Sequence, residues 1–173
     1  GVIDYVDNTG GGETIDSYID SGLGTALLLS PSPTPSPEST ETVDGFTQFT
    51  DTADSLTGQE NIKIRMMGGD DFLEVTGGIN YANGNMGEDT IILRGGFGEY
   101  LGGKDGDTIQ VFGAEEETSV NGNRGEDFIT GGVGGVIYRG GKDNDTLAVS
   151  QGAAWGDKGI DTFRGVTGEG YAV

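Results

Sequence analysis

The sequence predicts an all-β fold, a parallel β-solenoid built from coils of about 18 residues. A nine-residue pattern recurs six times between residues 66 and 164, and its copies are spaced by about 18 residues. Glycine, 35 of the 173 residues, divides much of the chain into stretches too short for helices. Within the repeats, apolar side chains alternate with others, as in half-buried strands. One such coil cannot bury its own apolar face, so the coils are expected to stack.

The repeat aligns on one aspartate, which occupies the sixth position of every copy. The eighth position is always a large apolar residue, and the first is glycine in five of the six copies. The copies are MMGGDDFLE (66–74), GNMGEDTII (84–92), GGKDGDTIQ (102–110), GNRGEDFIT (122–130), GGKDNDTLA (140–148) and GDKGIDTFR (156–164). Their aspartates, 16 to 20 residues apart, are Asp71, Asp89, Asp107, Asp127, Asp145 and Asp161.

Each coil is expected to contain two strands. The eighth position of the repeat begins one strand, with its side chain pointing inward. The return strand has an apolar residue seven positions before each aspartate, so two apolar rows face each other across a narrow core. Glycines at the first and fourth positions are expected to allow a positive φ and a close approach of neighbouring turns. These turn glycines are Gly69, Gly84, Gly87, Gly102, Gly122, Gly125, Gly140, Gly156 and Gly159.

Three segments are predicted along the chain. Residues 1–29 contain a degenerate copy of the repeat around Asp16 and are predicted as a strand segment that caps the open end of this solenoid or of a neighbour. Residues 30–44 form a linker rich in Pro, Ser and Thr; they contain all four prolines, which favour an extended polyproline II tether. Residues 45–173 form the solenoid domain, in which Asp54 belongs to one further, faint copy.

The composition excludes several classes of function. The chain has no cysteine and no histidine, so disulfides, thiolate nucleophiles, histidine-based dyads and Cys/His zinc sites are absent. Its formal charge of −20 disfavours nucleic acid and anionic lipid as partners, and no apolar stretch approaches the ~20 residues of a membrane span. Coils of this length leave no deep cleft, so we expect no enzymatic activity. Cations are the expected partners.

The aspartates point to calcium. Coils stacked at ~4.8 Å place like carboxylates above one another, which is repulsive unless a cation lies between them. Ca²⁺ accepts six to eight oxygens with loose geometry, so carboxylates and turn carbonyls can share it. About five Ca²⁺ ions would offset half of the −20 charge, and folding should depend on them. Besides the six repeat aspartates, the predicted ligands are Asp54, Asp105 and Asp143.

The pattern G-G-x-G-x-D-x-U-x, with U large and apolar, resembles the calcium-binding repeat of the RTX (haemolysin-type) family. The resemblance covers residues 66–164 and implies a parallel β-roll, calcium-binding turns and export from the cell. This chain departs from the family, which often places the nonapeptides in tandem, because here they occupy only every second half-coil. We therefore expect ions along one edge of the solenoid and none along the other.

Two functions are consistent with this sequence. The first is a secreted, calcium-binding structural protein of the cell surface or extracellular matrix, self-associating head-to-tail into filaments, since external calcium suits weak repeated sites. The alternative is a non-catalytic, polysaccharide-binding RTX module of a secreted protein. For the alternative, the third position of the repeat supplies an outward basic row, which would either bind an anionic glycan or screen neighbouring acids. This row is Lys104, Arg124, Lys142 and Lys158.

Overall fold

The computed structural model describes residues 18–19, 26–27 and 41–165, and the chain divides into two compact units, residues 1–34 and 35–173. In the first unit, β1 (Tyr18–Ile19) pairs antiparallel with β2 (Ala26–Leu27). Most of the predicted capping segment, with Asp16, lies outside the described residues, as do residues 30–40 of the predicted linker. The roles proposed for those residues stay predictions.

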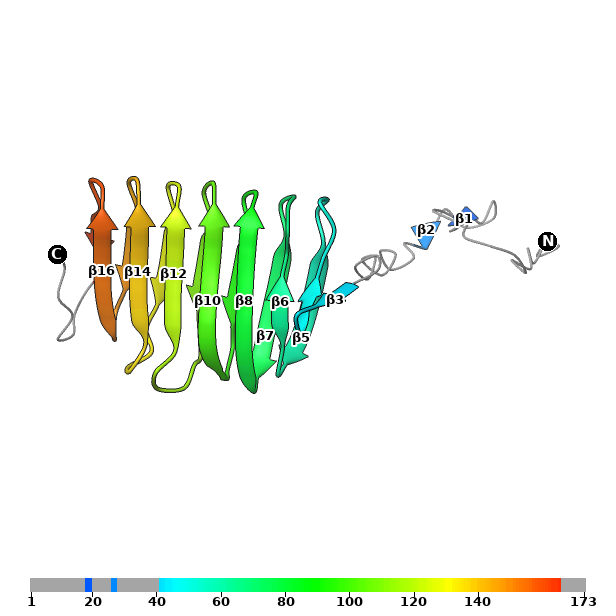
Figure 1. The fold of residues 1–173 in the computed structure, drawn as a ribbon, viewed down its shortest axis with the longest axis horizontal. Helices are drawn as coiled ribbons and strands as arrows, with labels where there is room; N and C mark the ends of the chain where they lie inside the picture. The colour runs from blue at the N-terminus through cyan, green and yellow to red at the C-terminus, as the bar shows by residue number, and fades with distance from the viewer. Residues whose placement is uncertain (1–17, 20–25, 28–40, 166–173) are drawn as a thin grey trace. The chain divides into compact units, whose positions relative to one another are not determined.

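The second unit is a parallel β-solenoid of two sheets, which confirms the predicted fold class (Figure 1). From β5 on, each coil contributes one strand to each sheet, and no helix occurs in residues 41–165. Sheet 1 contains β3 (Glu41–Val43), β4 (Phe46–Gln48), β6 (Lys63–Arg65), β8 (Ile79–Met86), β10 (Phe97–Lys104), β12 (Ser119–Arg124), β14 (Ile137–Lys142) and β16 (Ala153–Lys158). Sheet 2 contains β5 (Ser55–Glu60), β7 (Phe72–Gly77), β9 (Thr90–Leu93), β11 (Thr108–Val111), β13 (Phe128–Gly131), β15 (Thr146–Val149) and β17 (Thr162–Arg164).

Equivalent positions of successive coils lie side by side. In sheet 2, Ile91 pairs with Leu73 on one side and with Ile109 on the other. In sheet 1, Tyr100 pairs in the same way with Ala82 and Val120. Parallel pairing in register therefore places each copy of the repeat directly above the next. The parallel register is maintained across the longest coil, because the two additional residues of this coil are accommodated in the wide connection between β11 and β12 (Figure 1).

The core lies between the two sheets and is built from the two apolar rows that the sequence predicts. Leu73, Ile91, Ile109 and Leu147 of sheet 2 are fully buried, and so is Tyr100 of sheet 1. The strands alternate buried and more exposed residues, so one face of each sheet packs inward. Among the described residues, no helix is long and apolar enough to span a membrane.

The start of sheet 1 departs from the parallel pattern. β3 and β4 form an antiparallel hairpin, with Val43 opposite Phe46 and the turn residues Asp44 and Gly45 both at positive φ. This is the geometry of a two-residue turn of the Asp-Gly type. The hairpin covers the edge of β4 with a short strand, so the parallel ladder does not end there in an open edge.

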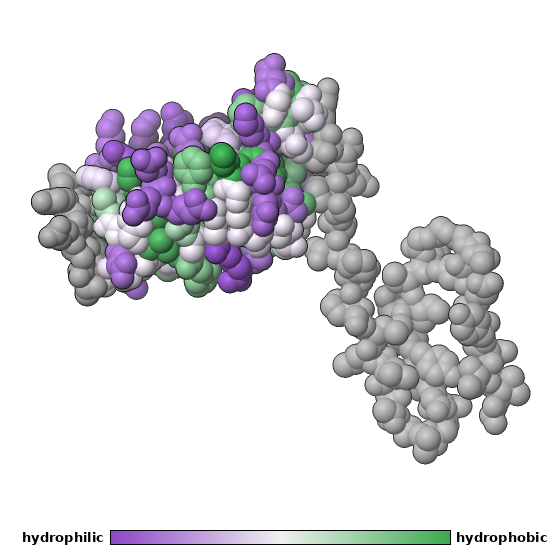
Figure 2. Space-filling view, turned by 90° about the horizontal axis from the view of Figure 1, so that it is seen from below, coloured by the Kyte–Doolittle hydropathy of each residue, from purple (hydrophilic) through white to green (hydrophobic). Residues whose placement is uncertain are grey.

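The two edges of the solenoid differ. We call the turns that lead from sheet 1 to sheet 2 the ladder edge, since they contain the repeat aspartates; the connections back to sheet 1 form the far edge. In Figure 1 the ladder edge is a row of tight, similar turns, and the far-edge connections are less uniform. Figure 2 views the solenoid from the far edge and shows hydrophilic and hydrophobic residues intermixed there. The exposed Ile79 and Phe112 lie at this edge.

Candidate functional site

The repeat aspartates lie at the last position of each tight turn, directly before a strand of sheet 2. Asp89, for example, follows the turn after β8 and precedes β9, and Asp107 stands in the same place between β10 and β11. The tight turn places each aspartate immediately before its strand of sheet 2. The backbone of successive coils is still aligned in parallel register at this position. The structure thus brings all the repeat aspartates and Asp54 into one stack along the ladder edge.

A chain of hydrogen bonds joins the members of this aspartate ladder. The backbone N–H of each aspartate donates to Oδ1 of the aspartate one coil further on. Six such bonds, of 2.7–3.0 Å, run from Asp54 through Asp71, Asp89, Asp107, Asp127 and Asp145 to Asp161. One carboxylate oxygen therefore satisfies a buried backbone donor of the neighbouring coil. The sequence predicts the stacking of these side chains but gives no sign of this capping role.

The second carboxylate oxygen, Oδ2, is buried and has no hydrogen-bond partner in five members of the ladder. The side chains concerned are at most 2 % exposed. Burial raises the pKa of these carboxyls, neighbouring carboxylates add to the rise, and the hydrogen bond from the backbone N–H opposes it. The pKa rises from 3.8 to about 6 at Asp145, about 7 at Asp71, Asp89 and Asp127, and about 8 at Asp107.

In the five repeats that begin with glycine, this glycine lies against Oδ2 of the aspartate of the same repeat, and in four of them that oxygen is unpartnered. A Cβ added at Gly84 would overlap both Oδ2 of Asp89 and the carbonyl oxygen of Gly102. A Cβ at Gly102 would likewise overlap Oδ2 of Asp107 and would come within 2.8 Å of the carbonyl oxygen of Gly122. A carboxylate oxygen of one coil and a carbonyl oxygen of the next therefore face the same point. These two oxygens together suit a hard cation such as Ca²⁺ as ligands.

The turn glycines meet two different requirements rather than the single one that the sequence predicts. At the fourth position φ is positive, as expected, and these residues are Gly69, Gly87, Gly125 and Gly159. At the first position φ is not positive, so the expectation of a left-handed backbone is wrong there. Those glycines are needed because a side chain would occupy the space of the carboxylate. They are Gly84, Gly102, Gly122, Gly140 and Gly156.

The two ends of the ladder differ from its middle. Oδ2 of Asp54 accepts hydrogen bonds from the backbone N–H and from Oγ1 of Thr50, both at 2.9 Å. Protein groups thus satisfy Oδ2 of this first carboxylate. At the other end, Asp161 is only partly buried. The five carboxylates with an unpartnered oxygen all lie between two described coils.

Asp105 and Asp143, also predicted as calcium ligands, lie outside the ladder. Both occupy the fourth position of the repeat, are exposed and have φ values of 73° and 80°. Oδ2 of Asp105 accepts a long hydrogen bond, 3.4 Å, from the backbone N–H of Gly87. Within the described part of the chain, no three acidic side chains gather into a cluster that could hold a metal ion. A cation at the ladder edge would therefore depend on backbone carbonyls as well as carboxylates.

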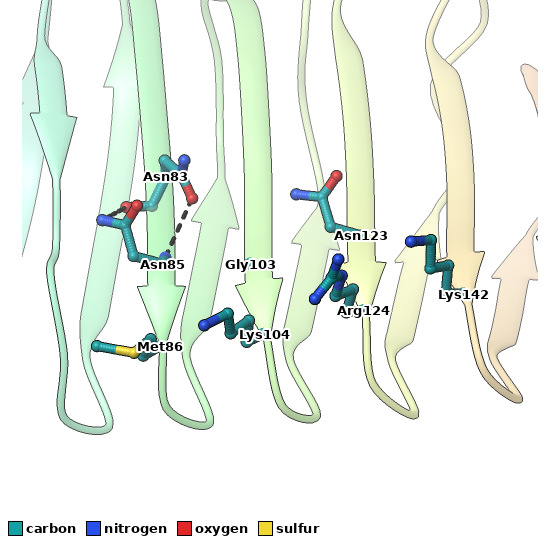
Figure 3. Close-up of a pocket in the computed structure, with 8 residues that line it drawn as sticks. All are labelled: Asn83, Asn85, Met86, Gly103, Lys104, Asn123, Arg124 and Lys142. Carbon is teal, nitrogen blue, oxygen red and sulfur yellow. Dashed lines mark hydrogen bonds between the residues drawn. The ribbon is translucent and has the colours of Figure 1, made fainter.

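The predicted basic row is present at the ends of four neighbouring strands of sheet 1. Arg124 pairs in register with Lys142, and Lys142 with Lys158. Lys104 lies one strand before Arg124 and beside Met86, as Figure 3 shows. In residues 41–165, the ion pairs are Arg94 with Glu74 and Arg139 with Asp157. The basic row therefore does not form direct ion pairs with the acids of the neighbouring turns.

Comparison with known proteins finds no match: no family model fits the chain, and no curated protein or solved structure is significantly similar to it. The RTX resemblance therefore depends on the repeat itself. What the structure establishes is a parallel β-solenoid of coils near 18 residues with a stacked ladder of aspartates.

Proposed function

We propose that this protein is a calcium-stabilised structural solenoid that holds a row of Ca²⁺ ions along its ladder edge and acts outside the cell. The observation that carries the proposal is the set of five buried Oδ2 atoms without a hydrogen-bond partner, each between two coils. A buried carboxylate oxygen in this condition is costly, and a proton or a cation relieves the cost. A stack of carboxylates in neighbouring coils favours the cation, because one divalent ion serves two coils.

The ligand atoms available at the ladder edge determine which type of ion it can bind. The ladder edge offers carboxylate and carbonyl oxygens, the ligands of hard cations, and the chain has no cysteine or histidine for softer metals. Ca²⁺ tolerates irregular coordination of six to eight oxygens, whereas Mg²⁺ requires a near-ideal octahedron and retains several waters. The five unpartnered oxygens support the expected number of about five ions.

The resemblance to RTX repeats supports export and a place at the cell surface or in the matrix, where calcium is abundant enough for weak sites. Self-association is the second part of the proposal. Among the described strands, β16 and β17 each end their sheet with one unpaired edge, which is a template for a further strand. Pairing of β17 with the free edge of β5 in another copy would extend sheet 2 head-to-tail.

Calorimetric titration with calcium, paired with light scattering of the same samples, tests the proposal. The informative variant is Asp107→Asn with Asp127→Asn in the ladder, and its matched control is Glu115→Gln with Glu117→Gln, which changes two exposed carboxylates of the far edge. Both variants remove two carboxylates. We expect the wild type and the control to bind several ions, and the ladder variant to lose about two of them.

Equal loss of calcium in the two variants, or no binding by the wild type, contradicts the assignment of the ladder. The light scattering tests self-association separately. We expect the mass to increase with calcium and with protein concentration, while a compact monomer at every concentration excludes filaments.

A further inference from the structure

A groove runs across the outer face of sheet 1, beside the basic row. One hollow of about 490 Å³ lies over β8, β10 and β12 and is lined by Asn85, Gly103, Lys104, Asn123, Arg124 and Lys142 (Figure 3). A second hollow, of about 380 Å³, shares Asn123 and Lys142 with the first and extends to Lys158 on β16. The two hollows therefore form one continuous groove across five neighbouring strands.

The backbone produces this groove. The second position of each repeat has a positive φ. On β8, β10, β12 and β14, in register across the sheet, it alternates as Asn85, Gly103, Asn123 and Gly141. Gly103 and Gly141 have no side chain, and their backbone lies against that of Asn85 and Asn123, whose amides line the groove. The floor of the groove thus alternates between asparagine amides and bare glycine backbone, and the basic row forms its margin on the side of the turns.

We propose that this groove binds a linear anionic polysaccharide that carries a carboxylate on successive sugars, such as a polyuronate. Coils stacked at ~4.8 Å place one cation on each successive strand from β10 to β16. None of these cations has an ion-pair partner among the described residues, although the whole chain carries a charge of −20. The cations are therefore available to a ligand that brings its own carboxylates.

The amides of the groove suit sugar hydroxyls. Asn83 Oδ1 accepts a hydrogen bond of 3.0 Å from the backbone N–H of Asn85, and Asn121 Oδ1 accepts the equivalent bond, also 3.0 Å, from Asn123. These bonds fix both side chains and leave their Nδ2 donors without a partner in the described region. Repeated, oriented amide donors beside a row of cations match a polymer that carries both hydroxyls and carboxylates.

An aromatic residue marks one end of the same face. Trp155 on β16 pairs in register with Arg139, whose guanidinium lies 5.1 Å from the centre of the indole ring. A partly exposed indole provides an apolar surface for a sugar ring. The one acidic residue in the groove lining, Asp157, is held by Arg139 at 2.9 Å. The repeated amide donors favour a sugar polymer over nucleic acid, whose binding relies mainly on phosphate neutralisation.

The test is a titration of the full chain, in millimolar calcium, with oligogalacturonates too short to gel. The groove variant is Lys104→Gln with Lys142→Gln; the matched control, Lys63→Gln with Arg164→Gln, removes the same charge from exposed positions outside the groove. We expect the groove variant to bind about tenfold more weakly and the control to stay within about twofold, since each lost charge contact is worth under ~1 kcal/mol. Trp155→Ala should also weaken binding, and circular dichroism reports whether each variant folds.

Neutral malto-oligosaccharides and single-stranded DNA of similar length complete the experiment. We expect neither to compete, and added salt to weaken the oligogalacturonate complex. Equal weakening in both double variants would show a general charge effect and overturn the groove assignment. Tighter binding of DNA, equal binding of the neutral sugar, or no binding of the uronate would overturn the ligand class. This test is independent of the aspartate ladder, because the groove uses none of its carboxylates.

Discussion

The two edges of the solenoid satisfy their buried polar groups by different means. At the far edge, Asn80 is only 5 % exposed and all its polar atoms are bonded. Its Oδ1 accepts from the backbone N–H of Ile62 at 3.1 Å, and its Nδ2 donates to the carbonyl oxygens of Gly77 and Gly78 at 2.9 and 3.0 Å. A neutral amide thus satisfies the backbone hydrogen-bonding groups of this buried connection without introducing a charge.

The far-edge connections use different residues in different coils to satisfy their buried polar groups. In the longest coil, the buried Thr118 donates through Oγ1 to the carbonyl oxygen of Glu115 at 2.8 Å. The ladder edge uses aspartate at every coil and leaves an oxygen unsatisfied in five of them. The comparison shows that closing a turn does not require a buried charge. It supports a role for the ladder carboxylates beyond turn formation, and the proposed cation binding would provide that role.

The largest expected effect is on the pH dependence of the metal-free chain. The folded-state pKa values of the ladder carboxyls are raised from 3.8 to between about 6 and about 8. Stability is therefore complete below the unfolded pKa and is lost as pH rises through about 7. The five carboxyls shift in the same direction, so their ionisation together destabilises the metal-free chain. In EGTA, we expect circular dichroism to show a folded chain near pH 5 and an unfolded one near pH 8.

Crowding at the ladder edge should have the next largest effect. Gly102→Ala would drive a Cβ into Oδ2 of Asp107, and we expect a loss of ~3 kcal/mol in urea unfolding with calcium present. The far-edge control is Gly134→Ala, whose Cβ would have Gln151 Oε1, 3.7 Å away, as its nearest neighbour. This control should change stability by less than ~0.5 kcal/mol. Equal effects at the two edges would contradict the close packing of glycine against carboxylate.

A reciprocal exchange of side chains compares the edges directly. Asp107→Asn replaces an ionisable carboxyl, whose charged form is penalised by burial, and keeps an Oδ1 acceptor, so it should stabilise the metal-free chain by ~2 kcal/mol near neutral pH and reduce the response to calcium. Asn80→Asp adds a buried charge and removes two N–H donors, so it should cost ~2 kcal/mol with or without calcium. Urea unfolding in EGTA and in calcium measures both. Rescue of Asn80→Asp by calcium would show that the far edge also binds ions.

The smallest effect is expected from the acidic run of the far edge. Glu115, Glu116 and Glu117 lie in the wide connection before β12 and are partly or fully exposed. Changing all three to Gln should alter stability by less than ~0.5 kcal/mol and leave calcium stoichiometry unchanged. Titration calorimetry of this triple variant tests this expectation. Loss of a bound ion would show that the far edge also takes part in calcium binding.

The sequence predicts the parts of this molecule that repeat. The position of the aspartates, the two apolar rows and the outward basic row all follow from period and alternation. The bonds of Asn80 and Thr118 could not be predicted in this way, because each occurs once. The hairpin at Asp44 and Gly45 has a recognisable Asp-Gly signal, which the proline-rich neighbourhood obscured. The sequence predicts that the coils stack, but the capping of backbone N–H groups depends on where each Oδ1 lies relative to the neighbouring coil, which only the structure shows.

The most direct test of the aspartate ladder is the thermal unfolding of the wild-type chain in EGTA and in saturating calcium, near pH 5 and near pH 8. If the buried carboxylates bind calcium, the ion should restore folding and raise the midpoint strongly near pH 8. It should have little effect near pH 5, where protons already neutralise the ladder. A chain that is equally stable in EGTA and in calcium near pH 8 would contradict the account.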